Sequence, residues 1–174
     1  ELDQEHGVLS TSPVWRPAMV MPRPDDVHAG ADVLNSGQKI TLLVGQGARG
    51  AQEQVVAIAE KLGAAMTTSL LGKPYVDESL PLAAGVMGHL GTSASGYALA
   101  NCDTLLIIGS NDPWTEFYPP PGAARAVQID SDSAAIGNRY PVEVGITSDA
   151  GPALDALIPL LEAKPDTPWR GKVE

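Results

Sequence analysis

The stretch LLVGQGARG, residues 42–50, joins an apolar run to three glycines spaced G-x-G-x-x-G, at Gly45, Gly47 and Gly50. An apolar strand that leads through such a turn into a helix is typical of dinucleotide-binding folds, in which N–H groups at the start of the helix face a phosphate. We expect Gly45 and Gly47 to permit a tight turn and a close backbone approach, and Gly50 to let the helix pack against the strand. A glycine-rich turn without a ligand is the alternative interpretation of the same pattern.

Apolar strands and amphipathic helices alternate on both sides of this turn. The sequence predicts strands at 40–44, 64–69, 82–87, 103–109, 125–130 and 142–146. It predicts one helix capped by Asp25 or Asp26 and running to Asn35, one after the turn that Gly63 ends, one over 94–100, and one through Leu161 that Pro159 kinks. Apolar strands between helices indicate parallel strands covered on both faces. The predicted fold is α/β: a three-layer, doubly wound, Rossmann-like domain with a six-stranded parallel sheet.

Composition limits the possible functions. The 174 residues suffice for one domain, and the formal net charge of -10 argues against nucleic acid as a partner. No apolar run is long enough for a transmembrane segment. The single Cys102 excludes an intrachain disulfide and favours a cytoplasmic location. The start, ELDQEHGVLS, has no initiator Met and suggests a piece of a longer chain or a processed product.

The identity of the nucleotide depends on the second strand. An NAD site requires an acid at the tip of that strand, but here the tip is TTSLL at 67–71 and the next acid is Asp77. Arg49, just before the helix, offers a guanidinium to a diphosphate; a surface arginine is the alternative. These features favour a nucleotide other than NAD.

The remaining polar and aromatic residues predict no catalytic group and no metal site. The 3 histidines and 1 cysteine lack metal-ligand spacing. Asp130 and Asp132 have no evident partner nucleophile or base for acid–base chemistry. The aromatic group of Trp114, Phe117 and Tyr118 is expected to cover an interface with a neighbouring domain.

Several longer segments, in order, carry a resemblance to a known family: LLVGQGARGA, TTSLLGKPYVDESLPLAAGVMGHLGT, CDTLLIIGSNDPW and AVQIDSDSAAIGNRYPVEVGITSDA. Together they resemble the central domain of thiamine-diphosphate-dependent enzymes of the pyruvate oxidase and acetolactate synthase group, over about residues 17–163. The segment GSNDPWTEF, residues 109–117, is most similar to the pyruvate oxidase branch.

The resemblance implies a parent enzyme that decarboxylates a 2-oxo acid with thiamine diphosphate and Mg²⁺. Those cofactors are bound by an N-terminal and a C-terminal domain that this chain lacks, and the parent is expected to be a homo-oligomer. The chain is then divided into an interdomain linker (1–24), the central domain (25–164) and a linker to the missing C-terminal domain (165–174). Alone, the fragment is expected to be inactive. The central domain of the family either binds FAD or serves as a structural spacer.

The resemblance also implies a path for FAD. The residues that match it are Gly45, Gly47, Ala48, Arg49, Thr68, Ser69, Leu70, Lys73, Gly88, His89, Gly109, Ser110, Asn111, Asp112, Asp130, Ser131, Asp149 and Ala150. Asp130 matches an acid near the adenosine ribose, where a carboxylate can accept two hydroxyl groups. Ser133 replaces the family's usual proline, and Pro113, Trp114 and YPPPGAA (118–124) are unusual, so we expect them to reshape or fill the adenine side. Two alternatives are a packing domain with an empty cleft and an NAD- or ADP-ribose-binding module.

Overall fold

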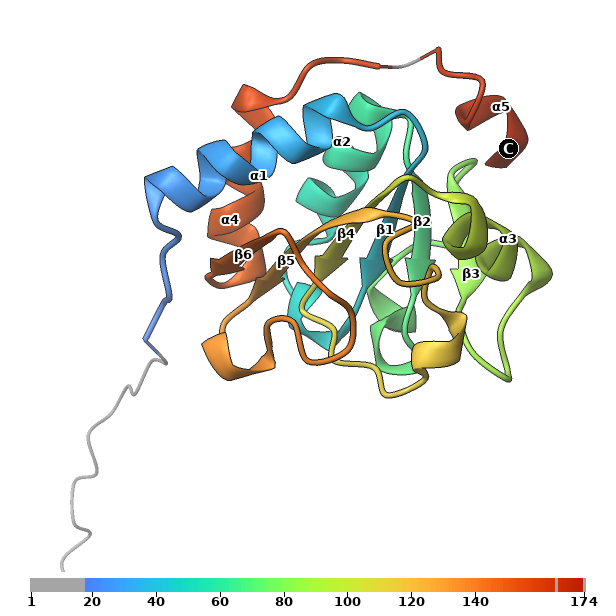
Figure 1. The fold of residues 1–174 in the computed structure, drawn as a ribbon, viewed down its shortest axis with the longest axis horizontal. Coiled ribbons are helices and arrows are strands. Elements are labelled where there is room, and N and C mark those ends of the chain that lie inside the picture. Colours follow the sequence, from blue (N-terminus) through green and yellow to red (C-terminus); the bar gives the residue numbers. More distant parts are fainter. Residues whose placement is uncertain (1–17, 165, 174) are drawn as a thin grey trace, which may run out of the picture.

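The computed structural model describes residues 18–164 and 166–173, and places six parallel strands in one sheet (Figure 1). The strands are β1 (Ile40–Val44), β2 (Ala65–Thr68), β3 (Ala83–Val86), β4 (Thr104–Ile108), β5 (Arg125–Asp130) and β6 (Val144–Thr147). Their order in the sheet is β3-β2-β1-β4-β5-β6. The chain therefore moves outward from β1, returns to pair β4 with the other side of β1, and continues outward. The predicted doubly wound α/β sheet is confirmed.

The two central strands are completely buried. β1 and β4 pair in parallel with Leu42 opposite Leu106, and all of their residues are buried. Thr41 is a polar exception on β1, and its hydroxyl donates a hydrogen bond to the carbonyl of Ala98 at 3.0 Å. Continuous apolar strands of this kind require helices or loops on both faces of the sheet.

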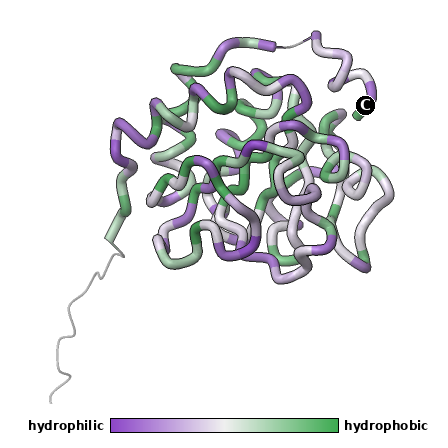
Figure 2. The backbone as a smooth tube through the Cα atoms, in the orientation of Figure 1, coloured by the Kyte–Doolittle hydropathy of each residue, from purple (hydrophilic) through white to green (hydrophobic). Residues whose placement is uncertain are grey.

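Helices cover the two faces unequally (Figure 1). One face packs against α1 (Pro24–Ser36), α2 (Gln52–Leu62) and α4 (Ala150–Leu157), and the other against α3 (Ser93–Asn101). Figure 2 shows the most hydrophobic stretches of the chain in the interior, where the strands lie. No helix among residues 18–164 and 166–173 has the length and apolar character that crossing a bilayer requires.

Two helix boundaries differ from the predicted ones. The first helix begins at Pro24, so Asp25 and Asp26 lie in its first turn. Their negative charges interact favourably with the helix dipole there, but neither residue caps the helix. The last helix ends at Leu157 and continues as a 3-10 turn, Ile158–Leu160, instead of a kinked α-helix. Proline at 159 lacks the N–H that an α-helical bond needs, which explains the change.

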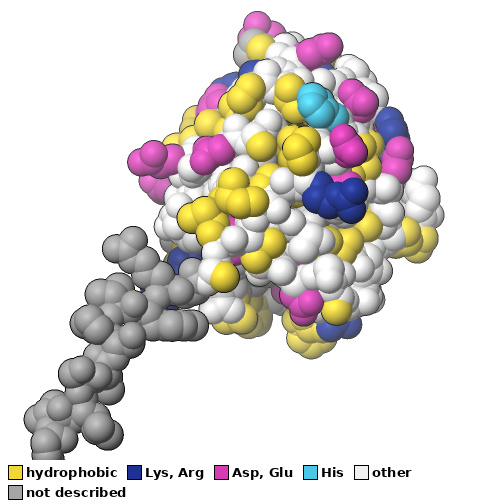
Figure 3. Space-filling model, turned by 90° about the vertical axis from the view of Figure 1, so that its left-hand side faces the viewer, with side chains coloured by type: hydrophobic (Ala, Val, Ile, Leu, Met, Phe, Trp, Pro, Cys, Tyr) yellow, Lys and Arg dark blue, Asp and Glu magenta, His cyan; other side chains and the backbone are white. Residues whose placement is uncertain are grey.

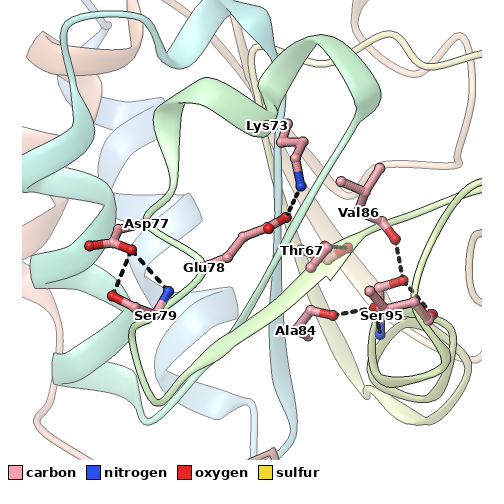
Figure 4. A network of polar contacts seen from close by, with 10 residues as sticks. Thr67, Lys73, Asp77, Glu78, Ser79, Ala84, Val86 and Ser95 are labelled. Atoms are coloured by element: carbon pink, nitrogen blue, oxygen red, sulfur yellow. Dashed lines mark hydrogen bonds and ion pairs between the residues drawn. The ribbon is translucent and has the colours of Figure 1, made fainter.

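The first turn of α3 covers the free edge of the sheet at β3. The Thr92 hydroxyl donates to the carbonyl of Ala84, and the Ser95 hydroxyl donates to the carbonyl of Val86 at 2.6 Å (Figure 4). Thr92 also caps the helix, because its side-chain oxygen accepts the N–H of Ser95 at 3.1 Å. The helix start is thereby capped, and the outward carbonyls of Ala84 and Val86 on the edge strand have partners.

The C-terminal segment returns to the core through Trp169. This side chain is 3% exposed, its Nε1 donates to the carbonyl of Ile40 at 2.9 Å, and its ring stacks on Tyr97 with 6.1 Å between centroids. The short helix α5 (Arg170–Val173) follows it. The end of the central domain at residue 164 stays a prediction. Trp169, which follows it in the chain, nevertheless packs into the core of the domain. Residues 1–17 of the predicted N-terminal linker lie outside the described residues.

Figure 3 shows the left-hand side of the molecule as drawn in Figure 1, the side on which α1 begins. Acidic side chains are spread there among hydrophobic and uncharged ones. This face lacks the gathered Lys and Arg residues that bind nucleic-acid phosphates.

Candidate functional site

Two cavities open at the carboxyl edge of the sheet, where the strand order reverses between β1 and β4. One has a volume of about 390 Å³ and the other about 400 Å³. Gln46, Gly109 and Asn111 line both, so the cavities meet at the ends of β1 and β4. In open parallel sheets this switch point is the usual place for a ligand.

The two cavities differ in chemistry. The cavity between the loops after β2 and β4 has an apolar wall made of Leu70, Leu71, Pro113 and Trp114. The cavity between the loops after β1, β4, β5 and β6 is polar and acidic, with Asp130, Ser131, Asp132, Ser148 and Asp149. We call them the apolar cavity and the acidic cavity. Each has the size of a small-molecule site.

The glycines of the opening motif hold the loops together. The N–H of Gly45 donates to the carbonyl of Ile108 at 2.8 Å, and that of Gly47 to the carbonyl of Gly109 at 3.0 Å. A Cβ on Gly45 would lie 2.2 Å from the Gly109 oxygen, so no side chain fits there. The N–H of Gly47 is thus bonded within the protein. The close backbone approach is to another loop.

Gly50 does not have the predicted role of letting the helix pack against the strand. A Cβ on Gly50 would meet nothing within 4 Å, so Gly50 does not serve helix–strand packing. Its φ of +83° is the left-handed conformation that side chains rarely adopt, which accounts for glycine at this position.

Asp130 and Asp149 each keep one carboxylate oxygen available in the acidic cavity. Asp130 Oδ1 accepts the N–H of Asp132 at 3.0 Å, and Asp149 Oδ2 accepts the N–H of Val20 at 2.9 Å. Within residues 18–164 and 166–173, neither carboxylate's second oxygen accepts a hydrogen bond. A carboxylate oxygen of this kind can accept a hydrogen bond from a sugar hydroxyl.

Buried aromatic residues support the loop after β4. The Tyr118 hydroxyl donates to the carbonyl of Asp112 at 3.4 Å, and its ring stacks on Tyr140 with 5.9 Å between centroids. Burial raises the pKa of Tyr118 far above its usual value, so the phenol stays neutral. The Asp112 carboxylate accepts the N–H of Trp114 at 3.1 Å and shapes the turn. The interior therefore fixes the loop that separates the two cavities.

The structure gathers part of the predicted FAD set around the cavities. Ten of these residues line them: Gly47, Ser69, Leu70, Gly109, Ser110, Asn111, Asp112, Asp130, Ser131 and Asp149. Eight others line neither cavity: Gly45, Ala48, Arg49, Thr68, Lys73, Gly88, His89 and Ala150. Ala48 and Ala150 are buried packing residues, and the buried Thr68 hydroxyl has no hydrogen-bond partner in the described structure.

Three basic members of the predicted set lie around the periphery. Lys73 pairs with Glu78 at 2.5 Å on the surface (Figure 4). The Arg49 side chain is exposed and makes no hydrogen bond or ion pair to any described residue. His89 lies edge-on against the rings of Trp114, at 5.1 Å, and Phe117, and its Nε2 is 3.2 Å from Glu116. His89 therefore braces the tryptophan that forms one wall of the apolar cavity.

Sequence reasoning left out several residues that line the cavities. Gln46, Leu71 and Asp132 are flanked by predicted site residues, and only this proximity could have indicated them. Pro113 and Trp114 were expected to affect the adenine side, but they line the apolar cavity, whereas Asp130 lines the acidic one.

A larger hollow, of about 620 Å³, lies outside this region. It is formed by α2 and residues 74–77 and includes none of the loops after β4, β5 or β6. Its lining is mainly apolar, with Val56, Ala57 and Tyr75 among its residues. Among the residues that the structure describes, no group of three His, Cys, Asp or Glu side chains is arranged to hold a metal ion.

Curated relatives match most of this chain but only a part of their own length. The chain is 38% identical over 151 residues to an uncharacterized 42.6 kDa protein of Pseudomonas amyloderamosa, covering 87% of this chain and 38% of that protein. It is 31% identical over 139 residues to the acetolactate synthase large subunit of Parasynechococcus marenigrum (76% and 22% covered). It is 26% identical over 153 residues to pyruvate oxidase of Lactiplantibacillus plantarum (86% and 25% covered).

A solved structure and a family model agree with these matches. An X-ray structure from Mycobacterium smegmatis, of an enzyme assigned as thiamin diphosphate-dependent, has a similar fold, with a TM-score of 0.72 at 24% identity. The similarity covers 91% of this chain and 32% of that chain. The model of the central domain of thiamine pyrophosphate enzymes matches residues 27–157. This chain therefore belongs to the family of thiamine pyrophosphate enzyme central domains.

Proposed function

We propose that this central domain binds FAD across the apolar and acidic cavities, within an enzyme that uses thiamine diphosphate and Mg²⁺ to act on a 2-oxo acid. The thiamine-binding domains lie outside this chain, which spans 22% to 38% of the length of the three curated relatives described above. We further propose a homo-oligomeric parent in the cytoplasm, where the buried, unpaired Cys102 is in keeping with a reducing environment.

The observation that carries the proposal is the contrast between two joined cavities. Leu70, Leu71 and Trp114 suit an apolar ring system, whereas Asp130 and Asp149 suit the hydroxyl groups of a ribose. FAD has this same division, with a flavin ring at one end and an adenosine at the other. Its diphosphate would lie where the cavities meet, at Gln46, Gly109 and Asn111.

The protein's own contribution is binding and orientation. When bound, the flavin supplies the capacity to accept and release electrons. Trp114, braced by His89, excludes water from one side of the apolar cavity, and the aromatic support under Asp112 keeps the dividing loop in place. No residue of this domain is assigned a catalytic role.

The two other interpretations explain less of this arrangement. An NAD-binding module of the usual orientation would place its ribose at the tip of β2, where Ser69, Leu70 and Leu71 line the apolar cavity. A structural spacer needs no particular pattern of polarity in its cavities. The Gly47 amide, which is bonded within the protein, is compatible with a spacer. The acidic cavity lies beside β4 and β5, away from β2. It therefore favours a nucleotide whose ribose lies toward β5, opposite to the usual NAD orientation.

A titration of this chain with FAD, followed by flavin fluorescence, tests the proposal. We expect saturable binding of one FAD, and roughly ten- to hundredfold weaker binding in Asp130→Asn, because hydrogen bonds to a charged group contribute about 1.5–3 kcal/mol. Asp32→Asn is the matched control, since Asp32 is exposed on α1. A folded chain that shows no saturable response to FAD would favour the spacer.

A further inference from the structure

Arg139 reaches the junction of the two cavities from a loop that the FAD motif does not include. Its Nε donates to Asn111 Oδ1 at 3.0 Å and to the Asn111 carbonyl at 3.3 Å, across a sequence separation of 28 residues. Asn111 lines both cavities. Arg139 thus contacts a residue that the apolar and acidic cavities share.

The turn that carries Arg139 is fixed from inside the protein. Gln128, on β5 and 2% exposed, accepts the N–H of Gly137 at 2.9 Å and donates to the carbonyl of Ala135 at 3.3 Å. On the other side of Arg139, the Tyr140 side chain is 3% exposed and its hydroxyl donates to the carbonyl of Ala124 at 3.2 Å. Arg139 therefore projects from a segment with two buried anchors.

This contact determines the orientation of the Asn111 amide. An asparagine side chain has an acceptor oxygen and a donor NH₂ group, whereas an arginine has donors only. The oxygen must therefore face Arg139, which turns Nδ2 away from it. Nδ2 makes no hydrogen bond to any residue that the structure describes.

The charges around the cavities require such a donor. The ionisable residues that line them are all acidic: Asp112, Asp130, Asp132 and Asp149. A diphosphate between these carboxylates needs donors and positive charge nearby. Lys73 is paired with Glu78, whereas Arg139 is held at the junction.

We propose that Arg139 is a positioning residue that fixes the Asn111 amide so that its NH₂ group donates to the diphosphate of the bound dinucleotide. The guanidinium charge adds to the attraction for the diphosphate. This inference rests on the proposed FAD site, and it assigns the recognition of the phosphates to an asparagine and an arginine rather than to the amide of Gly47.

Affinity measurements with and without phosphates test the proposal on this chain. The probes are FAD and ADP, which carry a diphosphate, and riboflavin and adenosine, which do not. We expect Arg139→Gln to lower the affinity for FAD and for ADP about tenfold, and to leave the affinities for riboflavin and adenosine within twofold of wild type. Arg23→Gln removes an equal charge from the exposed start of α1 and should leave all four affinities within twofold.

Three further variants separate positioning from charge alone. Asn111→Asp replaces the NH₂ donor by an acceptor and should weaken FAD at least as much as Arg139→Gln. In the double variant the loss of FAD binding should be smaller than the two single losses combined, because both changes act in part through the Asn111 amide. Arg139→Lys keeps the charge without the planar fork, and we expect an intermediate loss.

The outcomes distinguish this inference from the proposed function. Wild-type affinity for FAD in a folded Arg139→Gln variant overturns the role of Arg139 and leaves the FAD site standing. An equal loss for FAD and riboflavin means that Arg139 only maintains the fold, which also overturns it. If the wild-type chain binds neither FAD nor ADP, the proposed function itself fails and this inference fails with it. Circular dichroism and thermal unfolding of each variant report whether it is folded.

Discussion

Gly47 and Gly109 lie backbone against backbone at the carboxyl edge of the sheet. The Gly47 N–H donates to the Gly109 carbonyl at 3.0 Å, and a Cβ on Gly109 would lie 2.4 Å from the Gly47 Cα. Gly109 also has a φ of +56°, in the left-handed region. Two loops from neighbouring strands thus meet without side chains between them, which brings the apolar and acidic cavities together at Asn111.

This contact predicts that alanine is poorly tolerated at position 47. A Cβ there would lie 2.7 Å from the Gly109 Cα, so Gly47→Ala should lower the free energy of unfolding by about 1–3 kcal/mol. Gly151→Ala is the matched control, because a Cβ on this α4 residue would meet nothing within 4 Å. We expect it to be neutral or to stabilise by up to about 1 kcal/mol. Urea unfolding measures both, and equal stability of the two variants would contradict the packing argument.

The edge strand β3 should depend on the Thr92 hydroxyl. Thr92→Val removes both the helix cap and the partner of the Ala84 carbonyl, which should cost about 1–3 kcal/mol. Ser93→Ala changes an exposed hydroxyl next to it and should stay within about 0.5 kcal/mol. Hydrogen exchange should show faster opening of β3 in Thr92→Val alone; unchanged protection of β3 would show that the hydroxyl is dispensable.

Trp169 should stabilise the domain although it lies beyond residue 164. Trp169→Ala removes a buried ring and the hydrogen bond to Ile40, and should lower the unfolding free energy by about 3–5 kcal/mol. Trp114→Ala is the comparison, because the Trp114 side chain is 48% exposed. This substitution should lower the unfolding free energy by about 1 kcal/mol or less. Chemical denaturation checks the difference, and similar losses for the two tryptophans would exclude an anchoring role for Trp169.

The buried thiol of Cys102 should make stability fall at high pH. Burial raises its pKa from 9.0 to about 12, so the thiol of the unfolded chain ionises while that of the folded chain does not. The unfolded state then binds fewer protons, and the unfolding free energy decreases as the pH rises from about 9 toward 12. Its contribution is complete below pH 9.0 and is lost progressively above it.

Comparison with Cys102→Ala isolates this contribution. Between pH 9 and 10.5 the wild type should lose about 2 kcal/mol more than Cys102→Ala, at about 1.36 kcal/mol per pKa unit. Urea unfolding at several pH values gives the two slopes. The buried Tyr118 produces the same trend in both proteins, so the difference between the slopes reports the thiol. Parallel slopes would show that the Cys102 thiol is not protected in the folded state.

The apolar pattern of the sequence predicts the sheet well. The strands expected at 40–44 and 125–130 agree with β1 and β5, because a buried parallel strand is a continuous apolar run between turns. The strand expected at 142–146 is instead Val144–Thr147. Pairing with β5 decides where this strand lies. The Glu143 N–H donates to the carbonyl of Ala126, and the Glu143 carboxylate accepts a hydrogen bond from the Arg125 side chain. Such pairing is not contained in a local pattern.

The sequence by itself determined the α/β class, the parallel sheet, the resemblance to the thiamine-dependent family and the loops that carry polar groups. Only the tertiary structure decided how those loops meet. It placed the Gly47 amide against Gly109 and brought Arg139 to Asn111, across 28 residues. Periodicity and composition describe neighbours along the chain, whereas the site depends on which strand ends lie side by side. That arrangement follows from the packing of the whole sheet.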